Sequence, residues 1–134
     1  MKKVVESVEE LYGKADGTGE VILDEIAQCL RTTRLIAVAD LAAMMDADTH
    51  QLSMAVRLLT GMTVRDIINR WRLLQARDLL QGKAQETATD SGDGSKRASN
   101  GDRIRRLETA ARRCGWRSYR VMLKVAHRYG FKLE

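Results

Sequence analysis

The strongest constraint on the fold of this chain is an internal repeat, in which residues 38–61 recur 69 positions later as residues 107–130. In each copy, two stretches of helical periodicity flank a tight turn. A small Ala stands where the two helices would cross, and a Gly ends the second helix. The matched pairs are Val38 and Leu107, Ala42 and Ala111, Met45 and Cys114, Leu52 and Val121, Val56 and Val125, and Gly61 and Gly130. The pattern predicts two helix-turn-helix units, a motif whose second helix can enter the major groove of DNA.

The composition favours an all-α fold. The 134 residues can bury one core or two small ones, and they include no Pro and few aromatic side chains. No stretch alternates apolar and polar residues as a half-buried strand would. No apolar run is long enough to span a bilayer, and acidic residues at positions 6, 9 and 10 interrupt any signal-peptide core. We therefore expect an all-α protein of the cytoplasm, away from membranes.

Positive charge is concentrated at one end of the chain. Residues 103–134 carry ten Lys or Arg against two Glu, a net charge of +8, whereas residues 1–102 carry a net charge of −3. The basic residues are Arg103, Arg105, Arg106, Arg112, Arg113, Arg117, Arg120, Lys124, Arg128 and Lys132. A basic helical segment suits a polyanion, because each cation near a phosphate releases condensed counterions. A solvated basic face with no ligand is the alternative.

Residues 1–19 form the first expected segment, an amphipathic helix over residues 1–14 followed by a Gly-containing turn. Its apolar stripe consists of Val4, Val5, Val8, Leu11 and Tyr12, opposite Glu6, Glu9 and Glu10. The stripe can pack on the core of the same protein or bind a partner, and the sequence leaves both alternatives open.

Residues 20–81 form the second segment, with helices expected at about 20–31, 38–45, 48–61 and 63–81. Asp48 followed by Gln51 has capping-box spacing, so the third of these helices should begin there. The last helix should direct Val64, Ile67, Ile68, Trp71, Leu74 and Leu79 inward. Its arginines Arg65, Arg72 and Arg77 should point outward.

Residues 82–102 form the third segment, which we expect to be a flexible linker. They include no large apolar side chain, so their burial cannot offset the entropy of ordering them. Residues 103–134 form the fourth segment, the second helix-turn-helix unit. Its helices should run from about 102 to 114 and from Ser118 to Tyr129, with a turn at 115–117.

The titratable residues do not indicate catalysis or metal binding. Cys29 and Cys114 stand on apolar helix faces, where free thiols are usually buried, and no second Cys or His stands at ligand spacing. His50 and His127 are the neutral-pH bases, and neither has a patterned nucleophile or metal-ligand partner. We expect no metal, no cofactor and no enzymatic activity.

Several stretches resemble the AraC/XylS-type family of bacterial transcription regulators. Residues 41–48 and 59–64, with the sequences LAAMMDAD and LTGMTV, are similar to the family's first helix-turn-helix unit. Residues 69–73 and 76–80, NRWRL and ARDLL, resemble its long linker helix. The Ala-Ala, Cys-Gly-Trp and Tyr-Gly-Phe groups at residues 110–111, 114–116 and 129–131 resemble its second unit. The resemblance covers about residues 20–81 and 104–131.

The resemblance implies two helix-turn-helix subdomains joined by one long linker helix. In the family, the two recognition helices enter adjacent major-groove segments of double-stranded DNA, and activation works through contact with RNA polymerase. The chain leaves no room for the ligand-sensing domain of many members, so no small-molecule effector domain is expected. It resembles the short, stand-alone members.

The resemblance also assigns expected DNA-binding residues. In the first copy these are His50, Ser53 and Met54 at groove-facing positions, Thr49 and Gln51 beside them, and Arg57 near phosphate. In the second copy they are Ser118, Tyr119, Arg120, Met122 and Leu123, with Arg117 and Lys124 close by. Gln51 can pair with adenine through two hydrogen bonds, and Arg120 can pair with guanine in the same way.

The sequence departs from the family pattern in several places. Met54 and Leu123 stand where the family often has Arg, and Asp46 replaces the turn Gly of the first unit. The second turn is one residue shorter than usual in the family, and the linker is about twenty residues longer. The family normally adds a short helix after the position of Gly130.

The preferred function from sequence is a sequence-specific, double-stranded-DNA-binding transcriptional regulator. The alternative is a protein-interaction module of the same fold that modulates another regulator or RNA polymerase without reading bases. Apolar residues at the groove positions Met54 and Leu123 would suit a protein surface.

Overall fold

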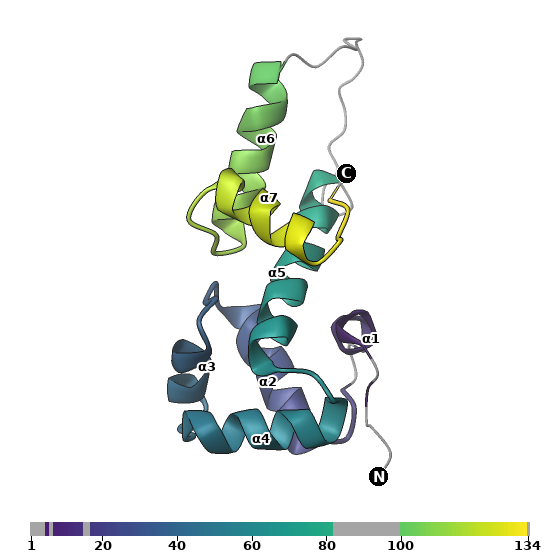
Figure 1. The fold of residues 1–134 in the computed structure, drawn as a ribbon, viewed down its shortest axis with the longest axis vertical. Coiled ribbons are helices and arrows are strands. Elements are labelled where there is room, and N and C mark those ends of the chain that lie inside the picture. The colour runs from purple at the N-terminus through teal and green to yellow at the C-terminus, as the bar shows by residue number, and fades with distance from the viewer. Residues whose placement is uncertain (1–4, 6, 15–16, 82–99, 134) are drawn as a thin grey trace. The chain divides into compact units, whose positions relative to one another are not determined.

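The computed structural model of the chain describes residues 5, 7–14, 17–81 and 100–133 (Figure 1). Every regular element within these residues is helical, which confirms the all-α class. The helices are α1 (Val8–Gly13), α2 (Val21–Thr32), α3 (Val38–Met44), α4 (Thr49–Thr60), α5 (Val64–Leu80), α6 (Asn100–Arg113) and α7 (Tyr119–Arg128). Within the described ranges, none of them is long and apolar enough to cross a membrane.

The chain divides into two compact units, unit 1 (Met1–Arg72) and unit 2 (Leu73–Glu134). The boundary falls inside α5, so this helix contributes its first half to unit 1 and its last two turns to unit 2. Most of the expected linker, residues 82–99, lies outside the described residues. Its last three residues, 100–102, belong to the first turn of α6, so the expectation of a flexible linker is wrong there. In this turn Asp102 forms an ion pair with Arg105 at 3.2 Å and lies at the positive end of the helix dipole.

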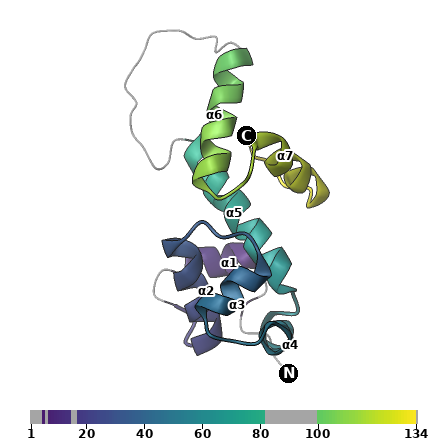
Figure 2. The same cartoon turned by 90° about the vertical axis from the view of Figure 1, so that its left-hand side faces the viewer.

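Unit 1 is built around the corner formed by α3 and α4, which pack against each other and against α2 (Figures 1 and 2). Its core consists of fully buried apolar side chains, among them Leu23, Ile26, Leu30, Leu41, Val56, Ile67, Ile68 and Trp71. The expected inward face of α5 is confirmed from Val64 to Leu74, whereas Leu79 is only half-buried.

The N-terminal helix α1 packs on the core of unit 1. Leu11 is buried, and the Tyr12 ring meets the edge of Trp71 with the ring centroids 4.9 Å apart. A helix over the whole of residues 1–14 was the expectation, and it is wrong at Val5 and Ser7, which are not helical, whereas residues 1–4 and 6 lie outside the described residues. Ser7 is extended and its side chain accepts from the Glu10 N–H, so it caps a shorter helix.

Arg72 is buried, with 1% of its surface exposed, so its expected outward orientation is wrong. Its Nε donates to the Leu35 carbonyl at 2.9 Å, and its Nη1 donates to the Leu30 carbonyl at 2.7 Å. The guanidinium thus joins α5 to the last turn of α2 and to the segment that follows it. Arg65 is exposed as expected, and Arg77 is half-buried beneath the Phe131 ring of unit 2, 5.2 Å from its centroid.

The turn of the first unit contains Asp46 in the left-handed conformation, with φ 54°. The Ala47 N–H donates to the Ala42 carbonyl at 2.9 Å, which closes the end of α3. Asp48 then caps α4 as expected, and its carboxylate accepts from the Gln51 N–H at 3.0 Å. Gly61, also left-handed, ends the helix.

Unit 2 repeats this arrangement with α6, α7 and the end of α5. Its core consists of Leu73, Leu74, Ala76, Leu107, Ala110, Ala111, Cys114, Trp116, Met122 and Ala126. Gly115 takes the left-handed turn position, and the Trp116 N–H donates to the Ala111 carbonyl at 2.8 Å. Ser118 caps α7 as expected, accepting from the Val121 N–H.

The two copies change register at the turn. The left-handed residues Asp46 and Gly115 are 69 positions apart, but the capping residues Asp48 and Ser118 are 70 apart. The expected equivalence of Leu52 and Val121 is therefore wrong. Leu52 is buried and its structural counterpart is Met122, whereas Val121 is 37% exposed.

Candidate nucleic-acid interface

Helix α4 presents an outer face whose position follows from its buried stripe. Leu52, Val56 and Thr60 recur every four residues and face the core of unit 1. The exposed residues are Thr49, His50, Gln51, Met54, Arg57 and Leu58, and Ser53 is half-buried beside them. The structure therefore brings the expected residues of the first copy onto one surface.

The outer face of α4 mixes hydrogen-bonding, cationic and apolar side chains. Gln51 and His50 lie in the first turn, from which recognition helices contact base edges. Arg57 lies two turns further on. Met54 and Leu58 are 55% and 64% exposed, one turn apart. Leu58 was not among the expected residues, although its four-residue spacing from Met54, away from the buried stripe, would have placed it on this face.

Helix α7 presents the corresponding face in unit 2. Its exposed residues are Arg120, Val121, Lys124, His127 and Arg128, while Met122, Val125 and Ala126 face the core. With the offset of 70 positions, Arg120 corresponds to His50 and Lys124 corresponds to Met54. The face has three permanent cations and no carboxylate, so it is more basic than the outer face of α4. His127 and Arg128 were not among the expected site residues.

Arg120 is held at the start of α7 by its neighbour Tyr119, which is half-buried. The guanidinium lies 5.8 Å from the centroid of the Tyr119 ring, and its Nε donates to the Tyr119 hydroxyl at 3.5 Å. This hydrogen bond raises the pKa of Arg120, so the side chain stays charged. A cation held over a ring is restricted in its rotamers, and less entropy is lost when it binds.

Two residues expected to contact DNA in the second copy, Met122 and Ser118, have structural roles in the helix and its cap. The expected groove-facing position of Met122 is wrong, because its side chain is fully buried. The turn before α7 is one residue longer than the turn before α4, and this extra residue rotates α7 so that Met122 faces inward. Ser118 is half-buried and its hydroxyl accepts from the Val121 N–H at 3.4 Å. Leu123 is half-buried, whereas Arg117 is exposed just before the cap.

Glu108 fixes the beginning of α7 from α6. Its Oε1 accepts from the Tyr119 N–H at 3.1 Å, and its Oε2 accepts from the Arg112 Nε. Both bonds lower the pKa of the Glu108 carboxyl, and the bond from Arg112 has the larger effect. The carboxylate also stands at the positive end of the α7 dipole. It therefore supports the helix whose outer face carries Arg120 and Lys124.

All ten Lys and Arg side chains of residues 103–132 are exposed. Two of them pair with carboxylates along α6, Arg105 with Asp102 and Arg112 with Glu108. Within the described part of the chain, no carboxylate pairs with Arg113, Arg117, Lys124, Arg128 or Lys132. Unit 2 therefore keeps an excess of positive charge available to an external anion.

The possible metal ligands and the two thiols can be located among the described residues. They contain no group of three or more His, Cys, Asp or Glu side chains that could hold a metal ion. Cys29 and Cys114 are both buried, as expected. Burial, helped by nearby Glu25, raises the pKa of the Cys29 thiol, which disfavours the reactive thiolate.

Comparisons of the chain with protein-family models, with curated proteins and with solved structures gave no match. The features that mark the interface are therefore its geometry and its charge. Two helices follow tight, left-handed turns, each carries an exposed polar face, and one of these faces is strongly basic.

Proposed function

We propose that this protein is a sequence-specific regulator of transcription that binds double-stranded DNA through α4 and α7. Each helix would enter a major groove with its outer face toward the bases. The observation that carries the proposal is the outer face of α7, where Arg120, Lys124 and Arg128 are exposed on a helix that follows a helix-turn-helix corner.

The outer faces of α7 and α4 would make different kinds of contact with DNA. On α7, Arg120 and Lys124 can pair with guanine edges or neutralise phosphates. On α4, Gln51 can pair with adenine, and the exposed methyl groups of Met54 and Leu58 can contact thymine methyls. Affinity would then come mostly from unit 2, and unit 1 would contribute more to sequence selectivity.

The resemblance to AraC/XylS-type regulators supports the regulatory part of the proposal. Membership in that family, location in the cytoplasm and contact with RNA polymerase are proposed on that resemblance. The proposal needs neither a cofactor nor a catalytic group.

The direct test is selection of bound duplexes from a random pool, followed by anisotropy titrations of the enriched sequence at several salt concentrations. We expect R120Q/K124Q to weaken binding about tenfold or more and to reduce the slope of log affinity against log salt by about 2. The double variant R34Q/R65Q removes the same charge from exposed positions elsewhere and should bind nearly as the wild type does. Equal losses in both variants, or no preference of the wild type for duplex over heparin, would contradict specific recognition.

A second candidate function is a protein-interaction module that does not read bases. The exposed Met54 and Leu58 favour it, because one turn apart they form an apolar strip on the outer face of α4. The variant R57Q/R120Q separates the two functions. DNA affinity should collapse if the protein is a DNA reader, and it should scarcely change if α4 serves a protein partner.

A further inference from the structure

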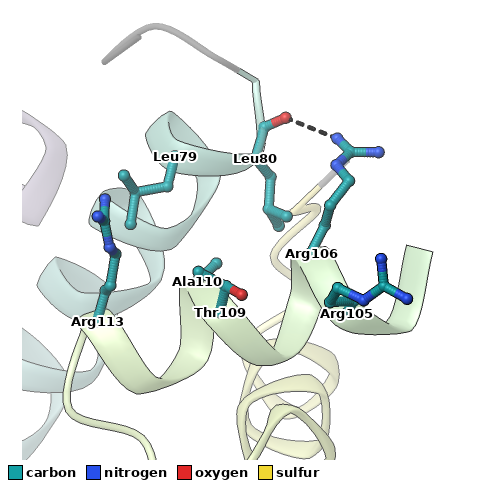
Figure 3. A pocket seen from close by; sticks show the side chains of 7 residues that line it. All are labelled: Leu79, Leu80, Arg105, Arg106, Thr109, Ala110 and Arg113. Atoms are coloured by element: carbon teal, nitrogen blue, oxygen red, sulfur yellow. Dashed lines mark hydrogen bonds between the residues drawn. The ribbon is translucent and has the colours of Figure 1, made fainter. Parts of the chain in front are cut away.

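A cleft of about 410 Å³ opens in unit 2 between the C-terminal end of α5 and one face of α6 (Figure 3). Leu79 and Leu80 project from α5 toward α6. On α6, Arg113 stands at one end of the cleft, and Arg105 and Arg106 stand at the other. The cleft is large enough for a small organic molecule.

Helical spacing explains why these α6 residues share a face. Arg106, Thr109 and Arg113 are separated by three and four residues, so they lie above one another along the helix. Glu108, which caps α7, stands on a different side of α6. The cleft is therefore distinct from the outer face of α7, and it shares no residue with the outer faces of α4 and α7.

The cleft has an excess of positive charge. Arg106 is oriented by a hydrogen bond from its Nη2 to the Leu80 carbonyl at 3.1 Å, and its other N–H groups have no partner among the described residues. Arg105 is paired with Asp102. Arg113 has no carboxylate partner among the described residues. Of the residues that the structure describes, three guanidinium groups thus stand at the cleft against the one carboxylate of Asp102.

The floor of the cleft is apolar. Leu80 and Ala110 are buried, with 9% and 3% of their surfaces exposed, and Leu79 is half-buried. The exposed Thr109 adds one hydroxyl group between the two charged ends. An anion without an apolar part, such as inorganic phosphate or a DNA backbone, would use the arginines but would gain nothing from the leucines.

We propose that this cleft binds a small organic monocarboxylate with an apolar body, such as a medium-chain aliphatic acid. A carboxylate can accept two parallel hydrogen bonds from a guanidinium, and Arg113 or Arg106 offers that geometry. The apolar body would lie on Leu79, Leu80 and Ala110 and leave water. The site would give unit 2 a small-molecule ligand, independently of whether α4 and α7 bind DNA.

The test is calorimetric titration of the full chain with octanoate, with acetate, octanol and inorganic phosphate as comparison probes. We expect saturable one-to-one binding of octanoate. Its affinity should be about tenfold or more higher than that of acetate, which lacks the apolar chain, or of octanol, which lacks the carboxylate. Backbone NMR shifts should be largest at residues 79–80 and 105–113.

Two variants locate the site. R113Q should weaken octanoate binding about tenfold by removing a charge-assisted hydrogen bond. L79Q should weaken octanoate binding but leave the weak response to acetate unchanged. The matched control is R117Q, an exposed arginine of the same unit outside the cleft, which should bind octanoate as the wild type does.

Three results would overturn the proposal. The first is the absence of saturable octanoate binding while the chain is folded by NMR. The second is equal weakening by R113Q and R117Q, which would indicate attraction by net charge. The third is complete competition by inorganic phosphate or duplex DNA at concentrations near that of octanoate, which would make the cleft a general phosphate site.

Discussion

Arg72 shows how one buried side chain can organise a helical unit. Its Nη1 and Nε donate to the carbonyls of Leu30 and Leu35, which lie near and beyond the end of α2. The carbonyls at a helix C-terminus have no partner within the helix and carry partial negative charge, so a guanidinium satisfies them well. The aliphatic stem of Arg72 is buried with the rest of the side chain, as are its neighbours Trp71 and Leu73.

Replacement of this arginine should destabilise unit 1. We expect R72A to lower the free energy of unfolding by about 3 kcal/mol, because the buried Leu30 carbonyl and the part-buried Leu35 carbonyl lose charged donors. R72K should recover only part of the loss, since an ammonium cannot span both acceptors as a planar fork does. Urea denaturation followed by circular dichroism measures the change. A loss no larger than that of R65A, at an exposed position of the same helix, would contradict this role.

The two turns offer a matched pair of residues in the left-handed region. Asp46 has φ 54° and Gly115 has φ 93°, and only Gly adopts such angles without steric cost. We expect D46G to stabilise the protein by up to about 1 kcal/mol and G115A to destabilise it by about 1–2 kcal/mol. Thermal unfolding of both variants tests the pair. Shifts of the same sign would contradict the shared role of the two positions.

At the scale of helices, local signals in the sequence predicted most boundaries. Asp48 and Ser118 accept hydrogen bonds from the first turns of α4 and α7, and Gly61 ends α4, all as expected. These boundaries depend on residues within a few positions of each other, so a single sequence contains the information. The start of α1 was missed because the apolar stripe continues to Val5, which is buried although it precedes the helix.

Features that depend on contacts distant in sequence were not predictable in the same way. The orientation of Arg72 depends on carbonyls more than thirty-five residues away, and a helical wheel contains no information about them. The position of Met122 depends on one residue in a turn, which the repeat offset concealed. The cleft in unit 2 joins residues 79–80 to residues 105–113, and no local pattern connects them.

The start of α7 should be sensitive to acid. Glu108 has a folded-state pKa below its ordinary value of 4.5, so its contribution to stability is present above that pH. The contribution is lost as the pH falls through the lowered value. E108Q keeps an acceptor for the Tyr119 N–H but loses the charge, so we expect earlier hydrogen exchange in the first turn of α7 at neutral pH. The difference from wild type should vanish in acid.

A charge-matched variant completes this experiment. E25Q removes an exposed carboxylate from α2 in unit 1 and should leave the exchange of α7 amides unchanged. If E25Q and E108Q accelerated exchange in α7 equally, the effect would come from net charge. The specific hydrogen bonds of Glu108 would then have no measurable part in holding the helix start.

At the scale of the whole molecule, the division into two compact units predicts separable stability. Unit 1 contains Arg72 and its two acceptors, whereas α6 and α7 belong to unit 2. We expect R72A to accelerate amide exchange in α2, α3 and α4 far more than in α6 and α7. Hydrogen exchange followed by mass spectrometry resolves the two groups. Uniform acceleration over all these helices would show that the chain opens as one cooperative body.

The turn before α7 has one residue more than the turn before α4. This difference determines how a recognition surface can be transferred from one copy to the other. One residue advances an α-helix by about 100°, so a single insertion changes which residues of a duplicated sequence face outward. A chimera that moves the outer face of α4 onto α7 must be aligned seventy positions apart, with His50 in place of Arg120. Aligned by the sequence repeat, it would replace the buried Met122 with Ser53 and expose Leu52 at position 121. A short insertion in a loop can therefore give two descendants of one ancestral helix different recognition surfaces while both keep the same fold.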